Sequence, residues 1–228
     1  MRPAWRRQLV LMVKAPEAGR VKTRLARGIG TVAALRFYRS ATTAMSHRVS
    51  RDRRWTTCLA IAPERALAHP AWPARLKRRG QGRGDLGQRM QRVVDELPPG
   101  PVVIVGSDIP GITPSLIARA FRELGRADVV VGPAPDGGYW LIGFKRLPGK
   151  PRIFDNVRWS HAETLADTLR NASHLRIATI DVLDDVDEAE DLPPVAGWSG
   201  RIVLPPAISN PICNSASYLR VTDKTGRT

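Results

Sequence analysis

The sequence is poor in the residues that build disulfide frameworks and zinc sites. Its 228 residues include only two cysteines, Cys58 and Cys213, and four histidines. The cysteines lie far apart and the histidines are scattered, so neither a disulfide-stabilised secreted fold nor a Cys/His zinc centre is expected. Cys58 stands in an apolar run and is expected to be a buried, reduced thiol.

Long hydrophobic runs are also missing. No segment approaches the length of about 18 apolar residues at which a membrane-spanning helix is predicted. The N-terminus imitates a signal peptide, because Arg2, Arg6 and Arg7 precede the apolar run Leu9–Val13. That run has only five residues before Lys14, which is too short for the hydrophobic region of such a signal. We therefore expect a cytoplasmic protein without a membrane span.

Acidic residues are scarce in the first half of the chain. Residues 1–100 hold 22 Lys and Arg against 6 Asp and Glu, whereas residues 101–228 hold 14 against 15, and the whole chain has a net charge of +15. Apolar residues make up 43% of the chain, which is ordinary for a soluble globular protein. The basic half is expected to face a polyanion, to hold phosphate groups, or to form a solvated surface.

Strand-like and helix-like segments alternate along the chain. Short apolar runs typical of buried strands lie at residues 8–13, 56–61, 102–105, 129–131, 139–144 and 175–182. Amphipathic or capped segments predict helices from Thr31 to Val49, from Asp85 to Leu97, from Thr113 to Leu124, and from a capping box of Ser160 and Glu163 to Asn171.

This alternation predicts an α/β fold, Rossmann-like, with a mostly parallel central sheet flanked by helices. Residues 62–84 are rich in Arg, Pro and Gly and are expected to be irregular. The periodic pattern fails from Pro193 onward, and the 36 residues from 193 to 228 include five prolines. We expect a single domain over residues 1–192, followed by a loosely ordered C-terminal tail over residues 193–228.

Three polar or glycine-rich segments follow predicted strands, where ligands of open parallel sheets bind. The first, from Lys14 to Arg24, combines Gly19 and Thr23 with four cations, of which Lys22 is one. Glycine, a hydroxyl and cations between a strand and a helix suit a diphosphate. The segment lacks the spacing of a Walker A loop, and a basic surface loop is the alternative.

The second segment places Ser107 and Asp108 directly after the strand at residues 102–105. A carboxylate there is well placed to hold a divalent cation together with substrate phosphates. The alternative is a turn aspartate that accepts hydrogen bonds from its own backbone.

The third segment, Asp136-Gly137-Gly138, forces a tight turn that lets a ligand approach the backbone. Asp136 is a candidate to orient or deprotonate an acceptor. Tyr139 and Trp140 follow, and Trp140 is expected to belong to the core.

Two weaker signals complete the candidate site. Residues 81–87 form a polar, glycine-rich segment that leads into a helix. The segment is expected either to contact the edge of a nucleobase or to be only a flexible loop. Asp187, in the acidic segment 184–191, is a candidate second metal ligand or part of a solvated acidic turn.

These motifs together resemble a known family. The segments Lys14–Leu25, Gly82–Met90, Gly106–Pro110, Pro133–Tyr139 and Phe154–Ser160 occur in order. They are similar to those of a bacterial domain-of-unknown-function family labelled glycosyltransferase or selenodomain-associated transferase, within the GT-A (nucleotide-diphospho-sugar transferase) superfamily. Phospholactate guanylyltransferases and molybdenum-cofactor guanylyltransferases are more distant kin. The resemblance runs from about Leu9 to Leu192.

The resemblance implies a nucleotide bound under the first loop, with the cations of that loop near its phosphates. It implies Mg²⁺ or Mn²⁺ on Asp108, with Asp187 as a possible second ligand, and Asp136 on the acceptor side. The superfamily's usual Asp-x-Asp is absent, since residue 106 is Gly and residue 110 is Pro. The residues expected to bind the nucleotide are Lys14, Gly19, Lys22, Thr23, Arg24, Gly82, Asp85, Gly87, Ser107, Gly137 and Gly138.

The leading interpretation is therefore a transferase that takes a group from a nucleotide-activated small-molecule donor. In a glycosyltransferase, an acceptor hydroxyl attacks the sugar, a base such as Asp136 helps, Lys22 supports the departing charge, and a nucleoside diphosphate leaves. The alternative is a nucleotidylyltransferase, in which a phosphorylated acceptor attacks and pyrophosphate leaves. A nucleic-acid-binding protein is a less favoured reading, because no aromatic residue lies within the basic run 75–83.

Overall fold

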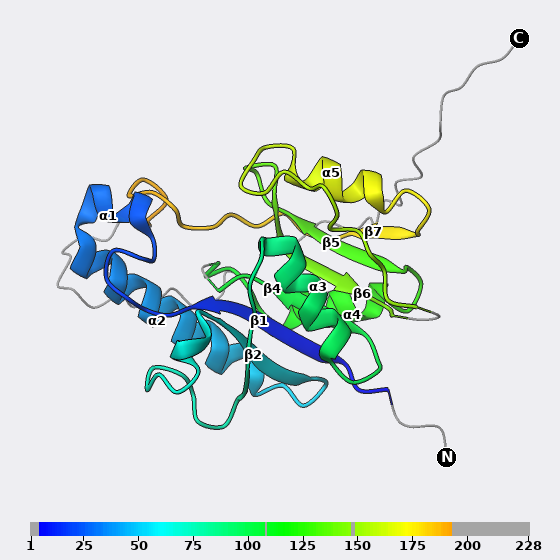
Figure 1. Cartoon of the computed structure of the whole chain (residues 1–228), viewed down its shortest axis with the longest axis horizontal. Helices are drawn as coiled ribbons and strands as arrows, with labels where there is room; N and C mark the ends of the chain where they lie inside the picture. The colour runs from blue at the N-terminus through cyan, green and yellow to red at the C-terminus, as the bar shows by residue number, and fades with distance from the viewer. Residues whose placement is uncertain (1–4, 108, 147–148, 193–228) are drawn as a thin grey trace, which may run out of the picture.

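A seven-stranded sheet forms the middle layer of the protein in a computed structural model that describes residues 5–107, 109–146 and 149–192 (Figure 1). Within these residues the strands are β1 (Gln8–Lys14), β2 (Thr56–Ala62), β3 (Lys77–Gly80), β4 (Val102–Val105), β5 (Val129–Pro133), β6 (Tyr139–Phe144) and β7 (Ile177–Thr179). Their order across the sheet is β3-β2-β1-β4-β6-β5-β7. All neighbouring strands are parallel except that β6 runs antiparallel to β4 and β5. The predicted fold class is confirmed.

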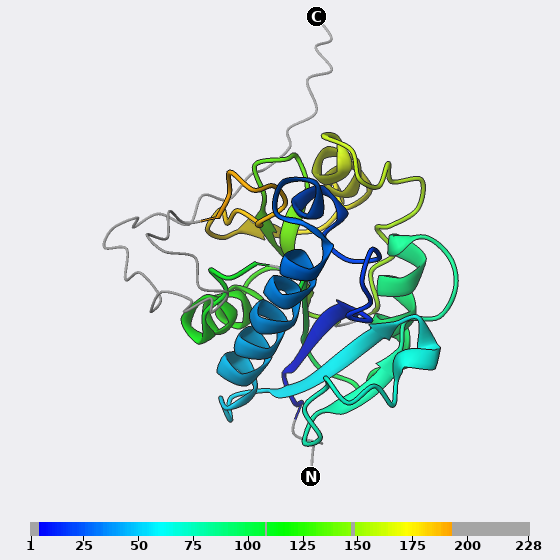
Figure 2. The ribbon, with the colours of Figure 1, turned by 90° about the vertical axis from the view of Figure 1, so that its left-hand side faces the viewer.

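Helices cover both faces of this sheet. Among the described residues the helices are α1 (Thr23–Ile29), α2 (Thr31–Ser50), α3 (Leu86–Glu96), α4 (Pro114–Glu123) and α5 (Thr164–Asn171), with one 3-10 turn, η1 (Glu64–Ala66). Helices α2 and α4 pack on one face of the sheet, and α3 with the end of α5 packs on the other. Figure 2 shows α2 and α4 together on one side of the sheet and α3 on the opposite side.

Alternation of side chains along β1 explains this layering. Leu9 and Leu11 point into the core shared with α2 and α4, whereas Val10 points into the core shared with α3. All three side chains are fully buried. Burying an aliphatic side chain of this size contributes about 1.5–3 kcal/mol, so a continuous apolar run is what a central strand needs.

Two of the predicted helix starts are confirmed. The carboxylate of Asp85 accepts a hydrogen bond from the Gln88 amide at 2.8 Å, and the Gln88 side chain accepts from the Asp85 amide. Thr113 caps α4 by accepting from the Leu116 amide at 3.3 Å, with Pro114 as the first helical residue. Each cap satisfies an amide that would otherwise lack a partner at the helix end.

The capping box predicted for Ser160 and Glu163 is wrong. Helix α5 begins at Thr164, and neither side chain makes a capping hydrogen bond. The amide of Glu163 instead donates to the His161 ring, and Ser160 has a left-handed backbone with φ of 56°. The local turn at His161 therefore replaces the box.

Three other boundaries differ from the sequence-based expectation. Gly30, rather than Thr31, caps α2, because Gly30 is the single residue between the end of α1 and the start of α2. The segment predicted to be irregular contains β3, whose sequence Lys-Arg-Arg-Gly has no apolar residue because it is an edge strand. The last strand is shorter than predicted, and β7 covers only Ile177–Thr179.

The proposed tail, residues 193–228, lies outside the described residues, so the domain boundary at residue 192 stays a prediction. None of the helices within the described ranges combines the length and the apolar composition needed to span a bilayer. Cys58 is buried as expected, and burial raises the pKa of its thiol.

Candidate functional site

Two adjoining cavities open at the carboxyl ends of the central strands. The larger has a volume of about 770 Å³ and the smaller about 250 Å³. Both are lined by Lys14 at the end of β1, Arg20 and Thr23 beyond it, and Arg89 in the first part of α3. Because the cavities share these four residues, they form two parts of one hollow, whose combined size suits a small organic ligand.

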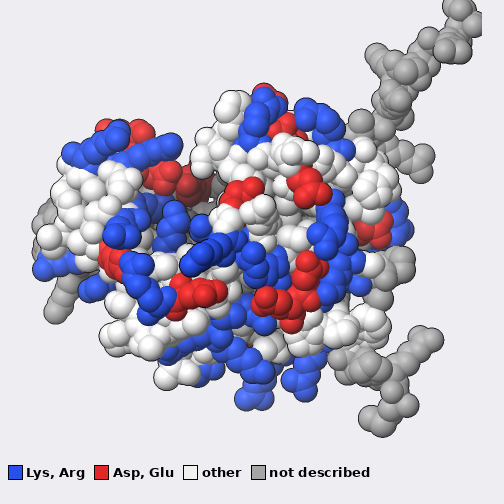
Figure 3. All heavy atoms as spheres, in the orientation of Figure 1, with Lys and Arg blue, Asp and Glu red and all other residues white. Residues whose placement is uncertain are grey.

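The larger cavity carries an excess of positive charge. Its charged lining residues are Lys14, Arg20, Arg65, Arg83 and Arg89 against Glu17 and Glu64. Figure 3 shows Lys and Arg side chains gathered around the notch between α1 and the rest of the molecule.

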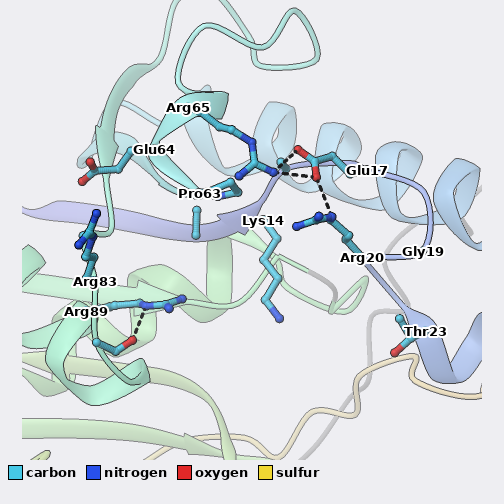
Figure 4. A pocket seen from close by; sticks show the side chains of 14 residues that line it. Lys14, Glu17, Gly19, Arg20, Thr23, Pro63, Glu64, Arg65, Arg83 and Arg89 are labelled. Atoms are coloured by element: carbon cyan, nitrogen blue, oxygen red, sulfur yellow. Dashed lines mark hydrogen bonds and ion pairs between the residues drawn. The ribbon is translucent and has the colours of Figure 1, made fainter.

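The cations of this cavity fall into two groups. Arg20 and Arg65 share one carboxylate, since each lies 3.2 Å from Glu17. Lys14, Arg83 and Arg89 pair with no carboxylate among the described residues; Arg89 donates instead to the Gly84 carbonyl at 2.8 Å. Figure 4 shows Lys14 and Arg89 extending into the middle of the cavity from different elements. An anion of several charges would find these cations already in place.

The backbone around the larger cavity depends on glycine at two turns. Gly19 has φ of 72° and Gly82 has φ of 74°, which lie in the left-handed region that other residues rarely adopt. A Cβ on Gly82 would also lie 2.1 Å from the Arg92 guanidinium. Both glycines line the cavity, and their part in binding a nucleotide stays a prediction.

Lys22, which lines the smaller cavity, forms an ion pair with Asp187. Lys22 precedes α1 with φ of 48°, and its side chain is only 4% exposed. Its Nζ donates to Oδ1 of Asp187 at 2.6 Å, and Nη1 of Arg24 lies 3.5 Å from Oδ2 of the same residue. Val186 beside Asp187 packs with Leu25 in a separate hydrophobic cluster of α1 and α2.

Tyr38 of α2 joins the ends of two neighbouring strands at the smaller cavity. Its hydroxyl accepts from the Lys14 amide at 2.9 Å and lies 3.0 Å from the Lys14 carbonyl oxygen. It also lies 3.3 Å from Oγ of Ser107, which follows β4. All three residues line the smaller cavity. A helix on one face of the sheet therefore contacts the Lys14 backbone and the Ser107 side chain at the ends of β1 and β4.

The segment from Asp136 to Gly138 lines neither cavity. Oδ1 of Asp136 accepts from the Gly138 amide at 2.9 Å, and Gly137 has φ of 83°. A Cβ on Gly137 would meet the Ala162 carbonyl oxygen at 1.9 Å, so glycine is required where this turn contacts the start of α5. The structure forms the predicted tight turn but does not bring it among the cations.

Two residues expected to bind the nucleotide, Asp85 and Gly87, have structural roles that account for the presence of these residue types. Asp85 caps α3, as described above. Gly87 lies buried in α3, where a Cβ would meet the Trp159 ring at 2.5 Å and Cβ of Phe154 at 2.8 Å. Neither residue lines the two cavities, so their place in nucleotide binding stays a prediction.

The structure leaves the metal site as a prediction. Asp108 lies outside the described residues. Within the described ranges, no group of three or more His, Cys, Asp and Glu side chains could hold a metal ion. Both carboxylate oxygens of Asp187 face cations, Lys22 and Arg24. The described residues do not by themselves fit a divalent cation, because none of those that line the smaller cavity is acidic and Asp187, the partner of Lys22, is already paired with two cations.

A network of charges holds the loop that leads into α5. Asp167 is almost fully buried and accepts from the Arg158 guanidinium at 2.7 and 2.8 Å and from Arg170 at 2.8 Å. The hydrogen bonds from Arg158, with those from Arg170, hold the pKa of Asp167 well below its usual range.

Sequence reasoning missed several residues that line the hollow. Glu64 and Arg65 lie in the segment expected to be irregular, and only their charge marks them out, whereas Arg83 belongs to the glycine-rich segment 81–87 but is not among the site residues predicted there. Tyr38 falls within the helix predicted from Thr31 to Val49, and nothing in its spacing indicates that its hydroxyl reaches Lys14.

Comparisons with known proteins agree with this fold. The family described as "Uncharacterized protein conserved in bacteria (DUF2064)" matches residues 44–161, just over half of the chain. No curated protein matches the chain. A solved structure of a candidate nucleotide-diphospho-sugar transferase from Desulfovibrio desulfuricans G20 is 29% identical, covers 80% of this chain and 82% of its own, and has a TM-score of 0.74.

More distant solved structures share the fold alone. Rv0371c from Mycobacterium tuberculosis H37Rv is 14% identical over 83% of this chain and 96% of its own, with a TM-score of 0.51. The 4-diphosphocytidyl-2C-methyl-D-erythritol synthase from Anaerococcus prevotii DSM 20548 is 10% identical over 82% of this chain and 94% of its own, also at 0.51.

Proposed function

We propose that this chain, which belongs to the bacterial DUF2064 family, is an enzyme that transfers a group from a nucleotide-activated donor to a small-molecule acceptor. The solved relative at 29% identity is itself described as a candidate nucleotide-diphospho-sugar transferase, which supports this proposal. The observation that carries it is the two-part hollow at the strand ends, lined by cations from four separate segments.

Each segment around the hollow has a role in this proposal. Lys14, Arg83 and Arg89 bind the phosphates of the donor substrate, and the Thr23 hydroxyl at the start of α1 donates a further hydrogen bond to them. Lys22 stabilises the charge that develops on the departing phosphate, because a buried ammonium acts in a site of low dielectric constant. Its partner Asp187 keeps the ammonium in position until the donor arrives.

The acceptor side is proposed to be the turn at Asp136, Gly137 and Gly138. In glycosyl transfer, an acceptor hydroxyl forms the new bond to the sugar carbon, the sugar–phosphate bond breaks, and Asp136 takes the hydroxyl proton. In nucleotidylyl transfer, the acceptor oxygen is already ionised and needs no such base. We also propose that Asp108 holds Mg²⁺ or Mn²⁺, which would assist either reaction. The protein is proposed to act in the cytoplasm.

Calorimetry against nucleoside diphosphates and triphosphates, with and without Mn²⁺, tests the proposed function. We expect at least one nucleotide to bind, and Lys22→Ala to weaken that binding about tenfold or more. Arg36→Gln is the matched control, because Arg36 is an exposed cation of α2 that lines neither cavity. If no nucleotide binds, or if the two variants behave alike, the proposed function is wrong.

A further inference from the structure

The charge of the hollow distinguishes two kinds of donor. With the same base, a nucleoside triphosphate carries roughly four negative charges near neutral pH, against roughly two for a nucleoside diphosphate sugar. A bound divalent cation lowers both charges equally, so the difference persists with or without metal. The number of cations without a carboxylate partner therefore indicates which donor the hollow fits.

The larger cavity has more positive charge than a diphosphate ester requires. Lys14, Arg83 and Arg89 have no carboxylate partner within the described residues, and Arg20 and Arg65 share the single carboxylate of Glu17. Glu64 also lines this cavity, and it forms no ion pair with any described residue. Five cations and two carboxylates therefore line this cavity.

The placement of these cations also fits an extended chain of phosphates. Lys14 ends β1, Arg83 lies in the turn after β3, and Arg89 lies in α3, and Figure 4 shows Arg83 and Arg89 on the same side of Lys14. Lys14 and Arg89 line both cavities, and Arg83 lines only the larger. A chain of phosphates that begins between the cavities and continues toward Arg83 would contact all three.

We propose that the donor is a nucleoside triphosphate and that the leaving group is pyrophosphate, a conclusion that rests on the proposed function. In the reaction, an ionised oxygen of a phosphate or carboxylate acceptor forms a bond to the α-phosphorus. The bond from that phosphorus to the oxygen bridging it to the β-phosphate breaks, and the electron pair leaves with pyrophosphate. The charges balance without release of a proton, so no general base is needed.

The test compares two ligands with the same base on the wild-type protein and its variants. Calorimetry at 0.1 M salt measures UTP against UDP-glucose and GTP against GDP-mannose. We expect the better triphosphate to bind about tenfold or more tightly than the matching diphosphate sugar, because the extra charges meet cations that are already in place.

The variants Arg83→Gln and Arg89→Gln then test whether these two cations cause the preference for a triphosphate over a diphosphate sugar. Each variant is expected to weaken triphosphate binding about tenfold and diphosphate-sugar binding less, since charge-assisted hydrogen bonds to the additional phosphate are lost. Arg36→Gln removes the same charge from outside the hollow and is expected to change neither. Both Arg83 and Arg36 are exposed, so these substitutions should leave the fold intact.

The outcomes separate this inference from the proposed function. If a diphosphate sugar binds at least as tightly as the triphosphate of the same base, the triphosphate inference is overturned and the nucleotide-dependent transferase stands. If the wild-type preference for triphosphate survives in both Arg83→Gln and Arg89→Gln, the assignment of these cations is wrong. If none of the four ligands or other nucleotides binds, the proposed function itself fails.

Discussion

Replacing Tyr38 by phenylalanine tests whether α2 fixes the edge of the sheet at the smaller cavity. The substitution keeps the ring, which is 3% exposed, and removes only the hydroxyl. That hydroxyl accepts from the Lys14 amide at 2.9 Å and lies 3.3 Å from Oγ of Ser107. The variant therefore leaves three polar groups at the cavity without this partner, namely the Lys14 amide, the Lys14 carbonyl and the Ser107 hydroxyl, while the hydrophobic packing of α2 is preserved.

The expected cost follows from the amide that loses its acceptor. A buried donor left without a partner costs about 1–3 kcal/mol, and the lower half of that range applies here because the bond at Lys14 is only partly buried. For a chain of this size, about 1–2 kcal/mol lowers the melting temperature by about 3–6 °C. Nucleotide affinity should fall as well, because the Lys14 backbone and the Ser107 side chain lose the hydroxyl that holds them at the cavity.

Thr42→Val is the control on the same buried face of α2. The Thr42 hydroxyl is buried and has no hydrogen-bond partner among the described residues, so valine should be neutral or slightly stabilising. Differential scanning calorimetry and nucleotide titration compare the two variants with the wild type. A Tyr38→Phe protein that melts and binds nucleotide like Thr42→Val would refute the reasoning.

Three further predictions test other parts of the molecule. Asp167→Asn should lower the free energy of unfolding at neutral pH and make that free energy less dependent on pH in acid. The pKa of Asp167 is depressed mainly by hydrogen bonds from Arg158. Its contribution to stability is therefore complete above the ordinary carboxyl pKa and disappears as the pH falls through the depressed pKa. Acid titrations followed by circular dichroism check this, and unchanged acid unfolding would contradict it. Gly137→Ala should destabilise the fold by at least about 2 kcal/mol, since the positive φ and the clash with the Ala162 carbonyl add together; urea unfolding with an unshifted midpoint would disprove it. Asp108→Asn should retain the wild-type melting temperature but lose any stimulation of turnover by Mn²⁺, and stimulation equal to that of the wild type would remove Asp108 from the metal site.

The central strands could be predicted because their signal is local. Residues 102–105 form a run of four apolar side chains, and in β4 all four are buried because helices cover both faces. The edge strand β3 gives no such signal, since Lys77, Arg78 and Arg79 precede its one glycine. An edge strand is defined by its neighbour β2, which a pattern read along the chain does not contain.

The candidate site divides in the same way. Lys14, Gly19 and Thr23 follow a recognisable strand, and all three line the larger cavity. Arg83 and Arg65 come from a segment without periodicity. Arg65 follows β2 in the 3-10 turn, and Arg83 is brought to the cavity by the pairing of β3 with β2. The ion pair between Lys22 and Asp187 joins residues 165 positions apart, and no spacing rule could connect them.

The contacts of the basic run at residues 75–83 bear on what the excess charge of the first half does. Arg78 donates to the Leu67 and Trp72 carbonyl oxygens, and Nη1 of Arg79 lies 3.5 Å from Glu96. Arg83 lines the larger cavity at the opposite end of β3 from Lys77. A surface that follows a nucleic-acid backbone needs neighbouring cations that are all available to phosphates. Here consecutive cations instead support carbonyl groups, pair with a carboxylate or line the cavity, which favours a compact phosphorylated ligand over a polyanion.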